Sequence, residues 1–145
     1  QKGFWTTVYF GTTNLSTFQA DLFAKFAANT YFTLSLAANS SKNSVTGGKV
    51  PYIPDVQLDA GLSVEVAQRL RILPSLRVVD RRVAVLYVTD RLKTFFVLGL
   101  RGEYSVVRSL DLFVDFQNLT DSKYDEWNGY RAAPFVASAG MSVRW

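Results

Sequence analysis

The stretch FVASAGMSVRW, residues 135–145, indicates the fold most clearly. Its odd-numbered positions are apolar or aromatic, and its even-numbered positions are small or polar except for Val136. Successive side chains of a β-strand point to opposite faces, so the alternation predicts a strand with one apolar and one polar face. The same period of two recurs upstream and predicts an all-β chain of eight antiparallel strands. They are expected at residues 4–10, 18–27, 32–36, 56–67, 73–83, 96–104, 110–117 and 135–145.

The links between these strands alternate in length. Barrels of the bacterial outer membrane alternate short periplasmic turns with longer extracellular loops in the same way. We therefore predict that residues 1–145 form a single transmembrane β-barrel domain of up-and-down strands in the bacterial outer membrane. The barrel is either small and closed or consists of the last strands of a larger one. The longer links are expected at residues 11–16, 39–54, 80–93 and 121–134, and the tight turns at residues 28–30, 68–70 and 106–109.

A soluble barrel or sandwich would show the same alternation, with its apolar face turned inward. The polar face of the expected strands distinguishes the two structures, because it is rich in Ser, Thr, Gly, Ala and Asn. Lys and Glu usually cover the outer face of a soluble sheet. The polar face and the alternating link lengths together favour the membrane barrel.

The composition excludes several functions. The net charge of +4 comes from scattered residues, so we expect no nucleic-acid partner. The chain has no histidine and no cysteine, which excludes Ser/His and Cys/His catalytic arrangements and histidine-based metal sites. We therefore expect neither an enzyme nor a bound cofactor.

Two sets of residues point to the membrane and to assembly in it. Aromatic side chains gather at the two interfaces of such barrels. The final residues fit the pattern polar-x-Gly-x-x-hydrophobic-x-aromatic, which resembles the signal read by the outer-membrane barrel assembly machinery. The aromatics expected at the periplasmic interface are Trp5, Tyr31, Phe32, Tyr104 and Trp145, and the residues of the assembly signal are Ser138, Gly140, Val143 and Trp145.

A wider resemblance covers the second half of the chain. The run FVDFQNLTDSKY at residues 113–124 is followed by Gly129, Tyr130 and Pro134 before the last strand, and VPYIP at residues 50–54 precedes an earlier strand. These features resemble the C-terminal barrel of TonB-dependent receptors. That family also carries a plug domain, an energy-coupling box and a barrel of 22 strands, for which this chain has no room. A strand end with an Asx-type turn would explain the Asn-Leu-Thr run without the family.

Two functions remain open from the sequence. The resemblance implies energised uptake of a siderophore, a cobalamin or a glycan, with a plug domain supplied elsewhere. The length favours a stand-alone eight-stranded barrel that serves as a membrane anchor, a scaffold or an interaction partner of another envelope protein, without transport. Other expected partners are outer-membrane lipid, lipopolysaccharide and the barrel assembly machinery.

Charged and aromatic residues mark two candidate sites. Carboxylates on the polar face could share a proton, but an ionic network inside the barrel is the favoured interpretation. The aromatics of the last long loop could contact a ligand or simply form solvated surface. The expected network comprises Lys25, Arg77, Arg101, Glu103, Asp111, Asp115 and Arg144, and the loop aromatics are Tyr124, Trp127 and Tyr130.

Overall fold

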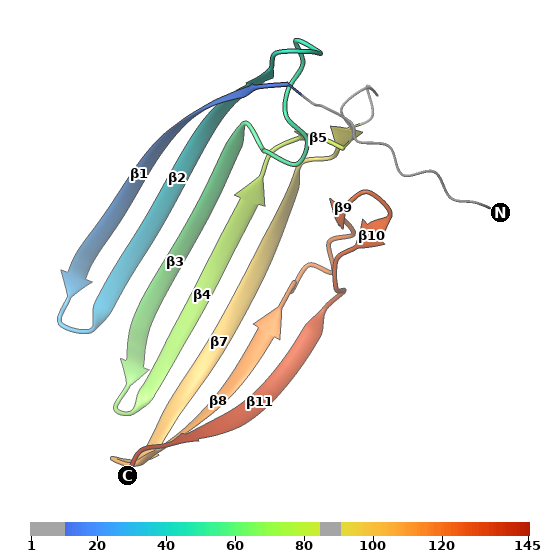
Figure 1. The fold of residues 1–145 in the computed structure, drawn as a ribbon. Coiled ribbons are helices and arrows are strands. Elements are labelled where there is room, and N and C mark those ends of the chain that lie inside the picture. Colours follow the sequence, from blue (N-terminus) through green and yellow to red (C-terminus); the bar gives the residue numbers. More distant parts are fainter. Residues whose placement is uncertain (1–10, 85–90) are drawn as a thin grey trace.

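The computed structural model describes residues 11–84 and 91–145 and consists of strands and their connections. Seven long antiparallel strands form one sheet in the order β1-β2-β3-β4-β7-β8-β11 (Figure 1). None of the described residues belongs to a helix long and apolar enough to cross a membrane. The long strands are β1 (Thr13–Ala27), β2 (Thr30–Asn43), β3 (Val56–Ala67), β4 (Leu70–Val79), β7 (Phe95–Val107), β8 (Leu110–Gln117) and β11 (Val136–Val143).

Four short strands make two hairpins that are separate from the main sheet. β5 (Arg82–Val83) pairs with β6 (Arg91–Leu92), and β9 (Asp125–Trp127) pairs with β10 (Tyr130–Arg131). Both hairpins lie in long connections, at the same end of the sheet (Figure 1). Sequence alternation did not predict them, because two or three residues are too few to show a period.

The prediction of eight up-and-down strands is therefore wrong, since the described residues alone form eleven strands. The strand expected at residues 4–10 lies outside the described residues, and the other seven expected strands correspond to the seven long ones. The link expected at residues 11–16 is also wrong, because β1 begins at Thr13 and extends the hairpin with β2. The strand expected at residues 73–83 is divided between β4 and β5.

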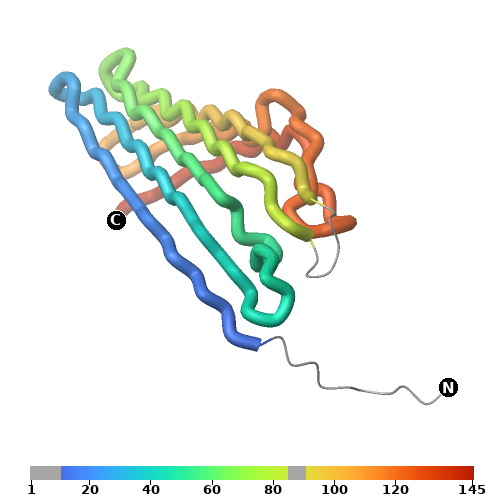
Figure 2. The backbone as a smooth tube through the Cα atoms, turned by 90° about the horizontal axis from the view of Figure 1, so that it is seen from above, coloured from blue at the N-terminus to red at the C-terminus, as the bar shows by residue number. Residues whose placement is uncertain are grey.

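The expected closed small barrel is wrong as well. β1 and β11 lie at opposite edges of the sheet and do not pair with each other. Figure 2 shows the sheet as an open, curved trough. Each of these two strands therefore has one backbone edge without a neighbouring strand in the described part of the chain.

The register of the strands aligns side chains of the same kind in rows across the sheet. Leu22 lies opposite Leu34, Leu34 opposite Ala60, Ala60 opposite Leu76, and Leu76 opposite Leu98. Residues directly opposite each other in neighbouring strands share a face, so this row is apolar from β1 to β7. The adjacent row runs through Asp21, Ser35, Asp59, Arg77 and Val97 and belongs to the polar face.

The apolar face is uncovered. Phe18, Leu22 and Met141 expose 64%, 53% and 69% of their surface. A sheet in water covers such a face with a second layer, whereas a membrane barrel exposes it to lipid. Among the described residues, the buried hydrophobic side chains are Val79, Ala84 and Leu92, which lie near the two short hairpins.

The connections are sorted between the two ends of the sheet. Two-residue turns join β1 to β2, β3 to β4 and β7 to β8 at one end, which we call the turn end. The connections at residues 44–55 and 118–135, and the described parts of the connection between β4 and β7 at residues 80–84 and 91–94, gather at the other end, which we call the loop end (Figure 1). Arg69 in the second tight turn has a φ of 71°, in the left-handed region that residues of tight hairpin turns often adopt.

One proline interrupts the sheet in the middle of β4. Pro74 pairs with Leu100 of β7, but the β3–β4 ladder lacks its pairs between Gly61–Ser75 and Val64–Ile72. Both missing pairs depend on a hydrogen bond from the nitrogen of residue 74 to the Leu62 carbonyl, and proline has no N–H to donate. A central strand rarely carries proline for this reason.

Candidate functional site

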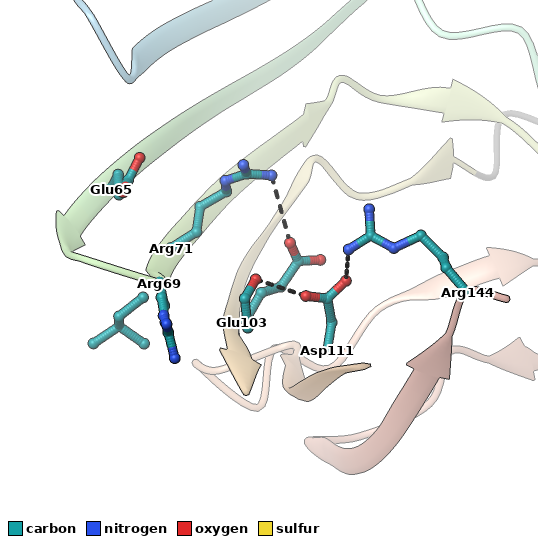
Figure 3. Close-up of a pocket in the computed structure, with 8 residues that line it drawn as sticks. Glu65, Arg69, Arg71, Glu103, Asp111 and Arg144 are labelled. Carbon is teal, nitrogen blue, oxygen red and sulfur yellow. Dashed lines mark hydrogen bonds and ion pairs between the residues drawn. The ribbon is translucent and has the colours of Figure 1, made fainter. Parts of the chain in front are cut away.

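Charged side chains of the polar face form a cluster at the turn end. Arg71 of β4 lies directly opposite Glu103 of β7, and its guanidinium is 3.7 Å from the carboxylate. Arg101 reaches the same carboxylate from two residues away, with Nε 2.8 Å from Oε1. On β8, Asp111 accepts a hydrogen bond from Ser105 at 2.6 Å and pairs with Arg144. Figure 3 shows both carboxylates between guanidinium groups from different elements.

This turn-end cluster lines a cavity of about 230 Å³. Glu65 and Arg69, from β3 and the turn after it, complete its charged lining. Glu103 is 30% exposed and Asp111 is 25% exposed, so water screens these ion pairs. Partly exposed pairs contribute about 0–1 kcal/mol each to stability. The cluster therefore acts mainly by fixing the positions of charges on the inner wall.

Farther along the polar face, an arginine lies over an aromatic ring. The Arg101 guanidinium is 4.1 Å from the centre of the Phe113 ring, at a distance typical of a cation–π contact. Gly140 of β11 lies directly opposite Phe113, and a Cβ added there would lie 2.6 Å from the ring. A glycine is therefore required for the ring to lie across β11.

A larger cavity of about 510 Å³ lies between the middle of the polar face and the loop end. Asp59 and Arg77 form an ion pair at 3.2 Å on its wall, and Asp115 accepts a hydrogen bond from Gln117 at 2.9 Å. Tyr124, from the last long connection, also lines this cavity. That connection therefore folds over the polar face of the sheet.

Aromatic rings and one arginine brace the connections of the loop end. The Tyr124 ring stacks on Phe95 with centroids 3.9 Å apart, and the Trp127 and Tyr52 rings lie 4.5 Å apart. Arg82 donates hydrogen bonds to the carbonyls of Asp125 at 3.0 Å and Glu126 at 3.5 Å, and its guanidinium lies 5.1 Å from the Phe95 ring. We call these contacts the loop brace, which joins three connections far apart in the sequence.

Burial changes the acid–base properties of the brace. Arg82 is 8% exposed, and desolvation lowers the pKa of its guanidinium, although the Glu126 carboxylate opposes the change. Desolvation raises the pKa of the Tyr124 hydroxyl, and the charge of Glu126 raises it further. The two shifts have the same main cause, because burial disfavours the charged form of each group.

The residues expected to form one ionic network form several groups. Arg101 and Glu103 form one ion pair, and Arg144 and Asp111 form another. Arg77 pairs with Asp59, which the sequence interpretation omitted. The Lys25 ammonium lies 5.6 Å from the Tyr31 ring centre and has no ion pair among the described residues, and the Asp115 hydrogen bond noted above is to Gln117.

The expected interface aromatics lie on different faces. Phe32 and Tyr104 belong to the apolar face, in register with Leu62 and Leu112. Tyr31 points to the polar face, where it stacks on Phe23 with centroids 5.8 Å apart. Trp5 lies outside the described residues.

The other expected residues lie on β11 and at the loop end. Ser138, Gly140 and Val143 belong to β11, and Trp145 follows it with a fully exposed side chain. Tyr124 and Trp127 belong to the loop brace, whereas Tyr130 is exposed.

Arg71 and Glu65 of the turn-end cluster were missed by the sequence interpretation, although they occupy polar-face positions in the alternation. The period of two places both side chains on the polar face, but it does not show which charges of the neighbouring strands they meet. That requires the register between the strands. Arg82 gave no signal, because its partners are backbone carbonyls of a distant connection. The described residues contain no group of three or more His, Cys, Asp or Glu side chains placed to hold a metal ion.

No family model and no curated protein matches the sequence. Among solved structures, the copper transporter OprC matches with a TM-score of 0.77 and 21% identity, over 92% of this chain and 24% of OprC. The ferric-catecholate import receptor Fiu of Escherichia coli K12 matches with a TM-score of 0.76 and 14% identity, over 90% of this chain and 21% of Fiu. The ferripyoverdine receptor of the outer membrane of Pseudomonas aeruginosa matches with a TM-score of 0.74 and 14% identity, over 90% of this chain and 19% of the receptor.

This chain thus spans between 19% and 24% of the length of these three structures. The TM-scores of 0.74 to 0.77 show that the backbone of the described sheet follows that of part of each structure. The described residues have the fold of part of the barrel of a TonB-dependent outer-membrane receptor.

Proposed function

We propose that the chain forms part of the barrel wall of a TonB-dependent receptor in the bacterial outer membrane, which takes up a siderophore, a cobalamin or a glycan. The observation that carries the proposal is a sheet with an exposed apolar face, whose edge strands β1 and β11 each have one edge that no strand of the described residues pairs with. Within hydrocarbon, each backbone N–H or C=O group without a partner costs several kcal/mol. Further strands must therefore pair with both edges, which makes the complete barrel larger than this sheet.

The lining of the polar face supports a wide interior. Thr33, Gly61, Ser75 and Gly99 occupy one row across four strands, so that the middle of the wall carries small side chains. A barrel of eight strands is filled by its own inward side chains, whereas a wider one encloses water or a second domain. A row of small residues suits the wider barrel.

The turn-end cluster suits a plug domain as the occupant of that interior. Its carboxylates and guanidinium groups alternate across β4, β7, β8 and the end of the chain. A folded domain that carries charges of both signs can form ion pairs with this cluster. The rest of the polar face can stay in contact with water. The stand-alone anchor or scaffold has no comparable support, because the described sheet does not close.

Uptake by cells of the native bacterium tests the proposal. A strain lacking the gene and a complemented strain would be supplied in turn with labelled ferric siderophores, cobalamin and glycans. We expect that accumulation of one nutrient requires the gene, and that deletion of tonB or addition of a protonophore abolishes it. A nutrient that requires the gene but enters equally well without TonB would contradict the proposal.

A further inference from the structure

A basic cavity opens at the loop end between the two short hairpins. Its volume is about 370 Å³, within the range of about 300–1,000 Å³ that is typical of small-molecule sites. The β6 strand and the residues after it form one side, and the connection that carries β9 and β10 forms the other. The lining residues that matter for recognition are Arg91, Lys93, Thr94, Lys123, Asn128 and Arg131.

The charge of this cavity is unbalanced. Among the described residues, four cations line it together with one carboxylate, that of Asp125, so these side chains carry a net formal charge of +3. None of the four cations has an ion-pair partner among the described residues, whereas Arg71, Arg77, Arg101 and Arg144 of the polar face are all paired. Like charges that converge without partners repel each other, and an anion between them relieves the repulsion.

The loop brace holds the two sides of the cavity in place. Tyr124 lines the cavity, and its ring is stacked on Phe95 of β7. The amide of Ala132 donates to the Tyr124 carbonyl at 2.9 Å, while Arg82 holds the carbonyls of Asp125 and Glu126. These contacts hold the backbone of the two sides in place, while the four cationic side chains are exposed at the mouth of the cavity. A site arranged in advance loses less entropy on binding.

We propose that this basic cavity binds a compact polyanion that carries phosphate groups. Two guanidinium groups provide planar pairs of donors for phosphate oxygens, and two ammonium groups add point charges. The phosphates have two sources, a soluble phosphorylated compound or the phosphorylated headgroup of lipopolysaccharide. The inference rests on the proposed function only in placing the loop end outside the cell.

Binding to the purified full-length protein in detergent tests the inference. Isothermal titration calorimetry would use pyrophosphate as the soluble probe and lipopolysaccharide, intact or enzymatically dephosphorylated, as the headgroup probe. The test variant combines Lys93→Gln with Arg131→Gln, one cation from each side of the cavity. The matched control combines Lys42→Gln with Arg108→Gln, which removes the same charge from exposed positions outside the cavity.

We expect the wild-type protein and the control to bind at least one phosphate probe equally well. The test variant should bind about 100-fold more weakly, because each lost contact to a charged group weakens binding about tenfold. Affinity for pyrophosphate would identify a soluble ligand, and affinity for intact but not dephosphorylated lipopolysaccharide would identify the headgroup. Failure of the wild type to bind either probe, or equal binding by test variant and control, would overturn the inference.

The cellular assay separates this inference from the proposed function. If the anion site is wrong, TonB-dependent uptake can persist while the binding experiment fails. If the receptor function is wrong but the anion site is right, the purified protein binds the phosphate probe in the calorimeter, and the uptake assay shows no dependence on TonB.

Discussion

The two faces of the sheet are built from the same strands but are organised differently. The apolar face has large exposed side chains such as Phe18 and Leu22, and its neighbours across strands are simply other apolar groups. The polar face carries specific contacts, such as Arg71 with Glu103 and Arg101 with Phe113, that depend on one register. Burial in lipid therefore explains why the residues of the apolar face are apolar. Specific pairing between strands explains which charged and aromatic residues lie together on the polar face.

The largest expected effect compares adjacent positions on opposite faces of β4. Leu76→Arg places a charge on the apolar face in the middle of the strand, and we expect it to destabilise the folded barrel by about 2–4 kcal/mol. Ser75→Arg is the matched control, because Ser75 lines the large polar cavity. Urea unfolding of the full-length protein in lipid vesicles measures both. Equal losses of stability would mean that the assignment of the two faces is wrong.

A smaller effect is expected where a glycine contacts a ring. Gly140→Ala places a Cβ against Phe113, and overpacking of this kind costs about 1–3 kcal/mol. Gly102→Ala on the apolar face is the control, because its Cβ would lie 3.4 Å from the Val114 side chain. Combining Gly140→Ala with Phe113→Ala should remove most of the clash. A double variant no better than the sum of its single variants would contradict this explanation.

Pro74 offers a test in the opposite direction. Pro74→Val restores an N–H that faces the Leu62 carbonyl, and we expect it to stabilise the barrel by about 0.5–1.5 kcal/mol. Hydrogen exchange should also slow at Leu62 and Ser63, which pair with β2 but lack ladder partners in β4. Lower stability of the variant, with unchanged hydrogen exchange, would show that the missing β3–β4 pairs are not caused by the absent N–H of Pro74.

The smallest effect is expected in the turn-end cluster. Glu103→Gln removes the charge that Arg71 and Arg101 share, and we expect a loss of about 0.2–1 kcal/mol because the pairs are partly exposed. The loss should shrink as salt is raised, since salt screens exposed pairs. Glu65→Gln is the matched control, because Glu65 lines the same cavity but has no ion pair among the described residues. A loss of several kcal/mol at high salt would mean that the cluster is more than a surface feature.

Much of the fold follows from alternation, because each long strand repeats one apolar and one polar face over eight or more residues. The tight turns also followed from the spacing between alternating segments. The short hairpins did not, because strands of two or three residues are too short to show a period, and β9 begins with two acidic residues. Closure could not be judged either, since alternation describes a strand and its faces but not the number of neighbours that a sheet has.

The candidate sites show a similar limit. The sequence indicated that charges on the polar face would meet, and several of them do. It could not assign partners such as Asp59 to Arg77, because a shift of register by one residue would place every side chain on the other face. The loop brace depends on contacts between residues more than 40 positions apart, such as Arg82 with Asp125, and no local pattern marks them.

The central claim is that this sheet is one part of a larger barrel. The most direct measurement is the mass of the denatured polypeptide that carries this sequence, extracted from the native outer membrane. We predict a mass several times 16.3 kDa, with the additional sequence supplying strands for the open edges of β1 and β11. A polypeptide near 16.3 kDa that is folded in the membrane as a monomer would contradict the claim.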